Sequence, residues 1–262
     1  MISSTSNNQI KNIAKLLKSS KARREQGVFL VEGKKMFLEA KKLGLLEKVF
    51  ISEELFGEWE AGKQLEGVSY EVVATKIFKE ITDTMTPQGV IATVRMYSTS
   101  VEDMLRNDKV RLVFLEDLRD PGNLGTIVRT AEGAGMTGIV LSRESVDIYN
   151  PKVVRSTMGS IFRMPFVYVE DIRAAMKQAQ QEGTVFYATH LKGEQYYDEI
   201  AYPQKVGIVI GNEANGITDE TAAQADTYVK IPMCGQVESL NAAVATSVMM
   251  YEIFRQQRIQ EK

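Results

Sequence analysis

Cysteine and histidine are almost absent from this sequence, which has one of each in 262 residues, Cys234 and His190. A single cysteine excludes an internal disulfide and fits the reducing cytoplasm. A Cys/His metal site is excluded as well, because such a site needs several of these side chains, and we expect no bound metal. The lone histidine follows a predicted strand and no G-x-S-x-G motif occurs, so a serine hydrolase is disfavoured.

Long apolar runs are also missing. None approaches the roughly 18 uninterrupted apolar residues that a membrane helix needs. The first ten residues are mostly polar, which does not fit a signal peptide. We therefore expect a cytoplasmic protein with no membrane partner. The 44% content of hydrophobic residues suffices for two compact domains or one large one.

The net charge is small, at −2, but the two signs are unevenly distributed along the chain. Residues 1–48 contain eleven Lys and Arg against four Glu, a net charge of +7, which leaves −9 for the remainder. A basic N-terminal segment on an otherwise acidic chain suggests an anionic polymer as the partner. A lysine-rich, solvated helix face is the alternative, and charge alone favours neither.

The common nucleotide-binding motifs are absent or misplaced. No Walker-type G-x-x-x-x-G-K-[ST] motif occurs, and residues 133–138 match the dinucleotide fingerprint G-x-G-x-x-G letter for letter. These residues close a predicted helix and enter a strand, whereas phosphate binding needs a strand that leads into a helix N-terminus. We interpret the match as a helix C-cap followed by a turn, so a nucleotide-dependent oxidoreductase is disfavoured.

Residues 1–98 predict a small α/β domain, because helical and strand-like periodicities alternate along them. Helices are expected at 8–20, 32–43, 53–65 and 76–82, and strands at 27–31, 48–51, 68–73 and 89–94. A short polar stretch that begins at Ser98 marks a linker, which we place at residues 99–109.

Residues 110–262 predict a second, larger α/β domain. Its strands are expected at 110–115, 138–141, 166–169, 184–189 and 206–210, and its helices at 124–133, 151–158 and 171–181. Such regular alternation indicates an open, mostly parallel sheet. Ligands bind these sheets outside the carboxyl ends of the strands, where we expect the loops at Asp117, Thr189, Gly211 and Pro232.

Residues 206–251 form the stretch around which the chain is organised. A strand leads into a tight turn, a second strand is stopped by Pro232, and a helix follows that Ser239 can cap. No charged residue occurs between Glu238 and Glu252, so this helix is apolar nearly all round. We expect it to be buried on more than one side, by its own domain or by a second copy of the chain.

One arginine lies on an otherwise apolar predicted helix. Arg129 stands between Val128 and Thr130, where it would serve either as a surface salt bridge or as a phosphate clamp. Considered alone, the salt bridge is favoured.

Three segments together resemble motifs one, two and three of the SpoU (TrmH-type) RNA ribose methyltransferases, within the SPOUT class. They are residues 123–131 (NLGTIVRTA), 210–216 (IGNEANG) and 231–241 (IPMCGQVESLN), and their order and spacing match as well. Motif three in the family usually reads S-L-N-V, whereas this chain continues with Ala242, which leaves the polar residues intact. The resemblance covers residues 110–258.

The front of the chain resembles, less specifically, the ribosomal-protein-like substrate-binding domain that precedes the catalytic domain in many members. The match depends on residues 29–33 (FLVEG) and 86–89 (TPQG). It implies that residues 1–98 bind RNA.

The resemblance implies a deep trefoil knot in the last third of the chain. Sequence physics alone would not propose one, because knots are nearly absent from proteins. Loops of that knot bind S-adenosylmethionine in the family, and the matching positions are Gly211, Ile231 and Leu240, with Thr189 and Met233 as neighbours. The family works as a homodimer, which agrees with the apolar last helix.

The resemblance also implies methyl transfer to the 2′-hydroxyl of a ribose in RNA. Arg129 is the expected catalytic residue, and because the pKa of arginine exceeds about 12, we favour stabilisation of the developing alkoxide or a grip on the adjacent phosphate over a role as base. Glu213 is expected to orient Arg129, while Asn123, Ser239 and Asn241 hold the ribose and the turn geometry.

Alternatives remain for several of these assignments. Glu213 and Asn241 could be turn caps only, and Cys234 is an alternative nucleophile for base methylation, although we interpret it as a loop residue. A non-catalytic RNA-binding protein of the same fold is disfavoured by the intact motif residues. The basic front and separate first domain favour large-subunit ribosomal RNA over transfer RNA, by analogy with antibiotic-resistance and ribosomal members of the family.

Overall fold

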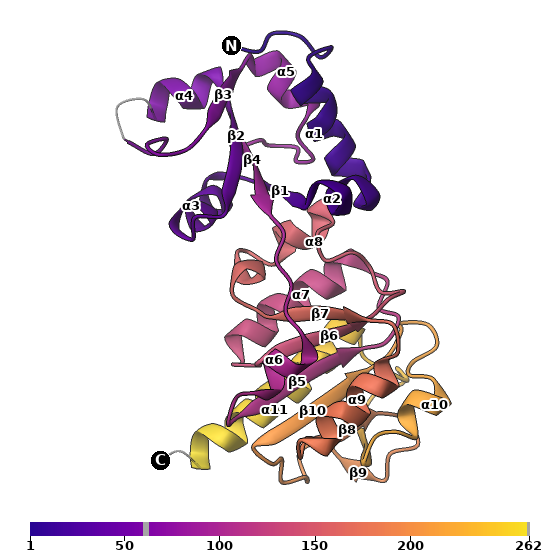
Figure 1. Ribbon diagram of the computed structural model, residues 1–262. Helices are drawn as coiled ribbons and strands as arrows, with labels where there is room; N and C mark the ends of the chain where they lie inside the picture. Colours follow the sequence, from indigo (N-terminus) through magenta and orange to yellow (C-terminus); the bar gives the residue numbers. More distant parts are fainter. Residues whose placement is uncertain (60–62, 261–262) are drawn as a thin grey trace. The chain divides into compact units, whose positions relative to one another are not determined.

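The chain folds into two compact units, seen in a computed structural model that describes residues 1–59 and 63–260 (Figure 1). The first unit comprises Met1–Tyr97 together with Asp147–Phe162. The second comprises Ser98–Val146 and Arg163–Lys262. The segment 147–162, expected within the second domain, therefore packs with the first unit.

The first unit is a four-stranded sheet with helices packed against it. The strand order is β1-β4-β2-β3; β4 runs antiparallel to β1 and β2, and β2 runs parallel to β3. The strands are β1 (Val28–Glu32), β2 (Leu46–Ser52), β3 (Tyr70–Val73) and β4 (Val90–Arg95). The helices outside the segment 147–162 are α1 (Asn8–Lys18), α2 (Ser20–Gln26), α3 (Lys34–Lys42), α4 (Glu53–Trp59) and α5 (Thr75–Glu80).

Helix α1 covers part of this sheet with one apolar face. Ile10, Ile13 and Leu16, spaced three residues apart, are all buried and join one core cluster with Leu30 and Phe50 of the sheet. The side chain of Asn7 caps the helix by accepting a hydrogen bond from the N–H of Gln9. The lysines of α1 remain on its outer face.

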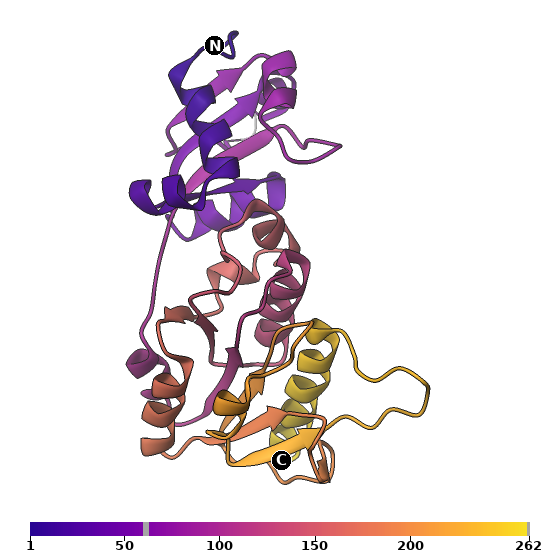
Figure 2. The ribbon, with the colours of Figure 1, turned by 90° about the vertical axis from the view of Figure 1, so that its right-hand side faces the viewer.

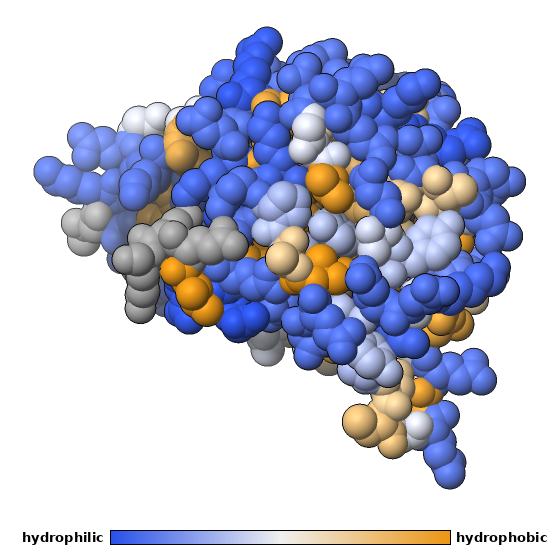
Figure 3. All heavy atoms as spheres, turned by 90° about the horizontal axis from the view of Figure 1, so that it is seen from below, coloured by the Kyte–Doolittle hydropathy of each residue, from blue (hydrophilic) through white to orange (hydrophobic). Residues whose placement is uncertain are grey.

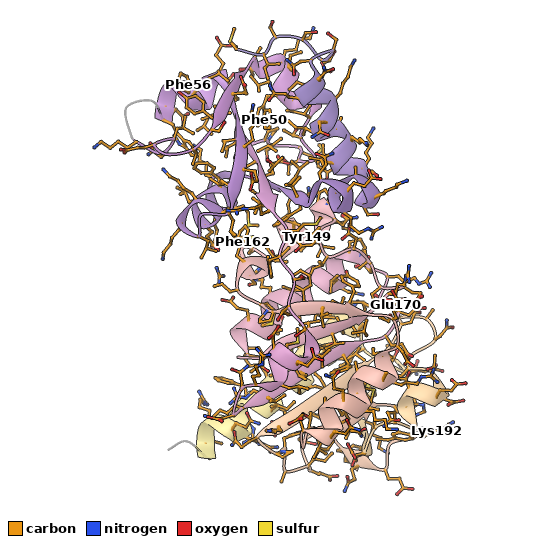
Figure 4. All side chains as sticks on the ribbon, viewed as in Figure 1. Phe50, Phe56, Tyr149, Phe162, Glu170 and Lys192 are labelled. Carbon is orange, nitrogen blue, oxygen red and sulfur yellow. The ribbon has the colours of Figure 1, made fainter. Side chains whose placement is uncertain are left out.

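The segment 147–162 is held in the first unit by buried side chains. It contains α8 (Pro151–Ser156) and the short helix η2 (Ser160–Phe162). The ring of Tyr149 lies 4.6 Å from that of Phe29, and the guanidinium of Arg23, 3% exposed, donates hydrogen bonds to Asp147 and to a backbone carbonyl of α1. The ring of Phe162 also lies near that of Phe29, at 6.3 Å, and Figure 4 labels both Tyr149 and Phe162.

The Tyr149 hydroxyl closes a pair of hydrogen bonds with Tyr97, accepting from its N–H at 3.1 Å and donating to its carbonyl at 2.7 Å. Burial raises the pKa of Tyr149, so its hydroxyl stays protonated at neutral pH and can both donate and accept. Tyr149→Phe should destabilise the first unit by about 1–3 kcal/mol, because it removes both of these part-buried hydrogen bonds. Denaturant unfolding measures this, with Tyr70→Phe, whose ring is 41% exposed, as the control that should change stability little. Equal stability of the two variants would contradict the structural role of the hydroxyl.

The second unit is built on a seven-stranded, entirely parallel sheet with the strand order β7-β6-β5-β10-β8-β11-β9. The strands are β5 (Val110–Leu115), β6 (Gly138–Ser142), β7 (Phe166–Val169), β8 (Val185–Thr189), β9 (Gln195–Tyr196), β10 (Lys205–Ile210) and β11 (Thr227–Lys230). The helices are α6 (Val101–Leu105), α7 (Pro121–Gly133), α9 (Ile172–Gln181), α10 (Asp219–Ala222) and α11 (Ala242–Gln260).

Helices cover both faces of this sheet. Buried residues of α6, α9 and α10 form one cluster with β5, β6, β8 and β10. Helices α7 and α11 pack against each other, and α11 lies against β10 on the opposite face from α9 (Figure 2). Strand β6 is buried at every residue and β5 at every residue except Arg111, as expected for parallel strands that are covered on both faces.

The sequence placed most elements correctly and missed the shortest ones. Residues 99–109, expected as a linker, contain helix α6, which packs into the core through three buried side chains. Helix α7 begins at Pro121, earlier than predicted, because Asp120 caps it and proline fits the first turn. Helix α11 begins at Ala242, and its capping side chain is that of Asn241 and not that of Ser239.

Among the described residues, no helix combines the length and apolarity needed to cross a membrane. The face drawn in Figure 3 is mostly hydrophilic, with apolar residues in small separate groups.

Residues 1–59 and 63–260 contain no group of three His, Cys, Asp or Glu side chains placed to hold a metal ion. The trefoil knot stays a prediction.

Candidate active site

Three loops of the second unit meet at the carboxyl ends of neighbouring strands. They follow β8, β10 and β11, and the last of them, residues 231–241, projects from the unit before α11 begins (Figure 2). Together they line a cavity of about 340 Å³. All five predicted cofactor positions line it: Thr189, Gly211, Ile231, Met233 and Leu240.

The loop after β10 is a tight turn fixed by its own hydrogen bonds. Asn212 and Gly216 exchange two backbone hydrogen bonds, of 3.0 and 2.8 Å, and the Oδ1 of Asn212 accepts from the N–H of Ala214. The Nδ2 of Asn212 donates to the carbonyl of Asp117, which ties the turn to the loop after β5. A Cβ at Gly211 would overlap the backbone of Gly216, so only glycine permits this close approach.

Three polar residues, one from each motif, form a single hydrogen-bonded cluster. The Nδ2 of Asn123 donates to Oε1 of Glu213 at 2.8 Å, and the Nδ2 of Asn241 donates to Oδ1 of Asn123 at 3.0 Å. Glu213 also accepts, at 3.5 and 3.3 Å, from the N–H groups of Arg119 and Asp120 just before α7. Hydrogen bonds therefore connect the three motifs to one another at the N-termini of α7 and α11.

Asn241 and Glu213 also have the capping functions that the sequence left open. The Oδ1 of Asn241 accepts from the N–H groups of Ala243 and Val244 in the first turn of α11. Glu213 lines the cavity as well as bonding the backbone before α7. Asn241 and Glu213 thus bond the backbone at a helix start and also belong to the polar cluster of the site.

Arg129 lies away from this cluster. It is exposed on α7 and is not among the cavity-lining residues, and in the described part of the chain it has no ion-pair partner. In this chain the carboxylate of Glu213 accepts hydrogen bonds from Asn123 and from the backbone, and its expected role in orienting Arg129 stays a prediction. The salt-bridge interpretation of Arg129 has no support among the described residues.

Ser239 is exposed and lines the cavity, whereas Cys234 is exposed but does not line it. The position of Cys234 therefore gives no support to its role as a nucleophile. Ser239 is followed directly by Leu240, which also lines the cavity, and by Asn241 of the polar cluster.

Several residues around the site were not predicted from the sequence. The carboxylate of Glu116 accepts hydrogen bonds from the N–H and hydroxyl of Thr218, at 2.8 and 2.9 Å, and from the hydroxyl of Thr221. It thereby holds the start of α10 against the loop after β5. His190 and Glu238 line the cavity. No motif marks these residues, although Glu116 directly follows a buried strand.

The residues present fit S-adenosylmethionine, the cofactor that the resemblance implies. Its adenine ring is apolar on both faces, and the cavity offers Ile210, Leu240 and Ala245. Its sulfonium is cationic, and the cavity walls carry the carboxylates of Glu213 and Glu238. Backbone groups of the tight turn would be available for the remaining polar contacts.

Comparison with known families assigns both parts of the chain. Residues 110–251 match the model of the SpoU rRNA Methylase family, which covers more than half of the chain. Residues 7–92 match the MRM3-like substrate binding domain.

Individual relatives match over nearly the whole chain. The 23S rRNA (guanosine(2553)-2′-O)-methyltransferase RlmP of Bacillus subtilis is 31% identical, covering 96% of this chain and 98% of that protein. The human mitochondrial rRNA methyltransferase 3 is 29% identical, covering 95% of this chain and 73% of that protein.

A solved structure agrees with the fold. The crystal structure of an AdoMet-bound rRNA methyltransferase from Sinorhizobium meliloti superposes with a TM-score of 0.86 and 32% identity, over 97% of each chain. The predicted fold class, a mostly parallel α/β sheet with a smaller N-terminal domain, is confirmed. The chain belongs to the SpoU rRNA methylase family and is a methyltransferase.

Proposed function

We propose that this protein transfers a methyl group from S-adenosylmethionine to a ribose 2′-hydroxyl in large-subunit ribosomal RNA. The observation that carries the proposal is the cluster of Asn123, Glu213 and Asn241, which joins all three motifs beside the cofactor cavity. The names of the Bacillus and human relatives support ribosomal RNA over transfer RNA. We expect the enzyme to act in the cytoplasm, where its single cysteine stays reduced.

When bound, the cofactor supplies an electrophilic methyl group. The chain must then hold the ribose in line and favour the loss of the hydroxyl proton, and positioning of this kind can lower a barrier by about 7–11 kcal/mol. Asn123, Ser239 and Asn241 are the positioning residues. Arg129 is the catalytic residue, because its permanent positive charge stabilises the developing alkoxide or holds the neighbouring phosphate.

Homodimer formation would place Arg129 where the reaction occurs. Val244 and Tyr251 on α11 are 49% and 50% exposed. They are seven residues apart and therefore share one face of the helix. Arg129 lies on α7, which packs against α11. A second copy that covers this face would bury both apolar side chains and bring the α7 arginine to the interface.

Sedimentation should therefore give the mass of two chains. Tyr251→Arg, which puts a charge in the proposed interface, should give the mass of one chain. Arg173→Glu on the exposed face of α9 should leave the dimer intact. A wild-type monomer would contradict the proposal.

We further propose that residues 1–98 bind the RNA substrate and that residues 110–262 perform methyl transfer. Lys11, Lys15 and Lys18 are exposed along α1 and follow one face of the helix. Cations at this spacing can neutralise successive phosphates of one strand, and each neutralised phosphate adds to the salt dependence of binding.

RNA affinity should accordingly fall steeply with salt. Replacing these three lysines with alanine should lower the slope of log affinity against log salt by about 2–3, roughly one unit for each lost phosphate contact. Filter binding over a salt series measures the slope, and Lys177→Ala on α9 is the control. A flat profile in the wild type would contradict the proposed RNA-binding role.

Methyl transfer from labelled cofactor to fragments of large-subunit ribosomal RNA tests the function itself. We expect the incorporated label to map to a ribose and not to a base. Incorporation only into transfer RNA would favour the alternative target. Tight RNA binding with no incorporation into either would favour a non-catalytic RNA-binding protein.

A further inference from the structure

One exposed arginine lies in the loop between β5 and α7, next to the polar cluster of the site. The side chain of Arg119 is 64% exposed, and its Nη2 donates to Oδ2 of Asp117 at 3.0 Å. Within residues 1–59 and 63–260 its guanidinium makes no other hydrogen bond. Because a guanidinium carries five N–H donors, most of them can bind a group that arrives from solution.

The side chain of Arg119 is anchored at both ends to the edge of the site. Its backbone N–H faces the carboxylate of Glu213 at 3.5 Å, and the same carboxylate accepts from the Nδ2 of Asn123 at 2.8 Å. At the other end, Asp117 holds the guanidinium and accepts, through its carbonyl, a hydrogen bond of 2.8 Å from Asn212 in the turn after β10. A ligand of the guanidinium therefore lies beside the polar cluster.

The charges around the polar cluster are otherwise negative. Its three residues come from the segments 116–123, 211–218 and 231–241, which contain one positive and five negative side chains, a net charge of −4. The negative side chains are Glu116, Asp117, Asp120, Glu213 and Glu238, and the positive one is Arg119. Each ribose in an RNA strand has a phosphate on either side, so a target ribose brings negative charge toward these carboxylates. A cation at this position offsets the repulsion.

Asp117 has an unfavourable conformation that fixes its carboxylate. Its φ is +59°, a left-handed value that is uncommon outside glycine, and its N–H donates to the Oγ of Ser142 at 2.8 Å. Its Oδ1 is shielded from solvent and has no hydrogen-bond partner among the described residues, which is costly for a carboxylate. Such a conformation at the edge of a site indicates a functional constraint. Here it places Oδ2 against the guanidinium of Arg119.

We propose that Arg119 binds an RNA phosphate next to the ribose that is methylated, and that Asp117 positions the guanidinium for this contact. The planar fork of arginine matches two phosphate oxygens, and Asp117 holds one edge of it while the phosphate meets another. Because Arg119 does not line the cofactor cavity, the contact contributes to RNA binding and not to cofactor binding. Arg119 lies outside the three motifs, and its role rests on the proposed function.

Arg119→Ala should weaken the binding of a ribosomal RNA fragment that the wild type methylates by about tenfold, the effect of one charge-assisted contact. The slope of log affinity against log salt should fall by about one. The kcat at saturating RNA should stay within about twofold, because a phosphate that does not react is held equally before and during methyl transfer. Arg173→Ala is the matched control: Arg173 also pairs with an aspartate two positions earlier, and its loss should change none of these quantities.

RNA fragments with one neutral linkage test where the contact lies. A methylphosphonate removes the charge of a single phosphate, and it is placed on one side or the other of the methylated ribose. One of these two fragments should bind the wild type about tenfold more weakly than unmodified RNA, whereas Arg119→Ala should bind both equally. A wild type that tolerates both substitutions, or an Arg119→Ala variant that loses as much affinity as the wild type does, would overturn the inference.

Asp117→Asn tests the positioning role, because asparagine tolerates the left-handed conformation but has no charge. RNA affinity should fall about threefold, with no further loss when the change is made in Arg119→Ala. If Asp117 only neutralised Arg119, its replacement would strengthen RNA binding, and that result overturns the positioning role. A wild type that methylates RNA but whose RNA affinity does not depend on Arg119 contradicts this inference alone, whereas one that methylates no RNA contradicts the proposed function.

Discussion

Replacing Arg129 with alanine should lower the rate of RNA methylation by about 10²–10³-fold, the effect of removing one group that stabilises charge developing in a transition state. Affinity for S-adenosylmethionine should stay within about twofold, because Arg129 does not line the cofactor cavity. Single-turnover methyl transfer measures the first effect and calorimetry the second. The exposed position of Arg129 also predicts that the variant folds normally.

Two further variants separate this role from a general effect of charge. Arg129→Lys keeps the positive charge but loses the planar fork of donors, so partial activity is expected. Arg173→Ala, on the exposed face of α9, should be fully active. If Arg129→Ala loses cofactor affinity in proportion to its activity, the residue belongs to cofactor binding and its catalytic assignment falls.

The second large effect is expected at Gly211. A side chain there would overlap backbone atoms of Gly216 and Ile217, which cannot move aside as a flexible side chain would. Gly211→Ala should open the turn after β10, destabilise the second unit by at least about 1–3 kcal/mol and weaken cofactor binding by about tenfold or more. Thermal unfolding with and without cofactor measures both changes.

Gly235→Ala is the matched control in the neighbouring loop. A Cβ at Gly235 meets nothing within 4 Å, so this variant should bind cofactor and unfold like the wild type. Normal cofactor affinity in Gly211→Ala would mean that the turn does not shape the site, and the assignment of the cavity would then be wrong.

The strands and long helices could be predicted because their patterns are local. The run at residues 110–115 is apolar at nearly every position and became β5 with the predicted bounds. Helix α6 was missed because it has only five residues, too few to show a period, and its stability comes from packing Val101, Met104 and Leu105 into the core.

Contacts between distant segments were the harder part. The association of Asp147–Phe162 with the first unit depends on Tyr149 meeting Tyr97 and Arg23 meeting Asp147, pairs separated by 52 and 124 positions. Local sequence carries no record of such pairs. The motifs of the site were recognisable, but the hydrogen bond between Asn123 and Glu213, 90 positions apart, was not predicted, because no local pattern pairs the two motifs.

Sequence motifs nevertheless located the cavity. Thr189, Gly211, Ile231, Met233 and Leu240 are spread over 52 positions, and all line it. Parallel strands bring their carboxyl ends to one edge of a sheet, which explains why residues so far apart converge. The role of each residue in binding the cofactor is a proposal that the Gly211 variants begin to test.

We propose above all that this chain methylates a ribose in large-subunit ribosomal RNA through Arg129. Mapping of 2′-O-methyl groups in the RNA of cells that lack the protein tests it most directly. We predict that one ribose of large-subunit ribosomal RNA loses its methyl group, and that the wild-type protein restores it while Arg129→Ala does not. An unchanged set of ribose methylations in that RNA, or restoration by Arg129→Ala, would contradict the claim.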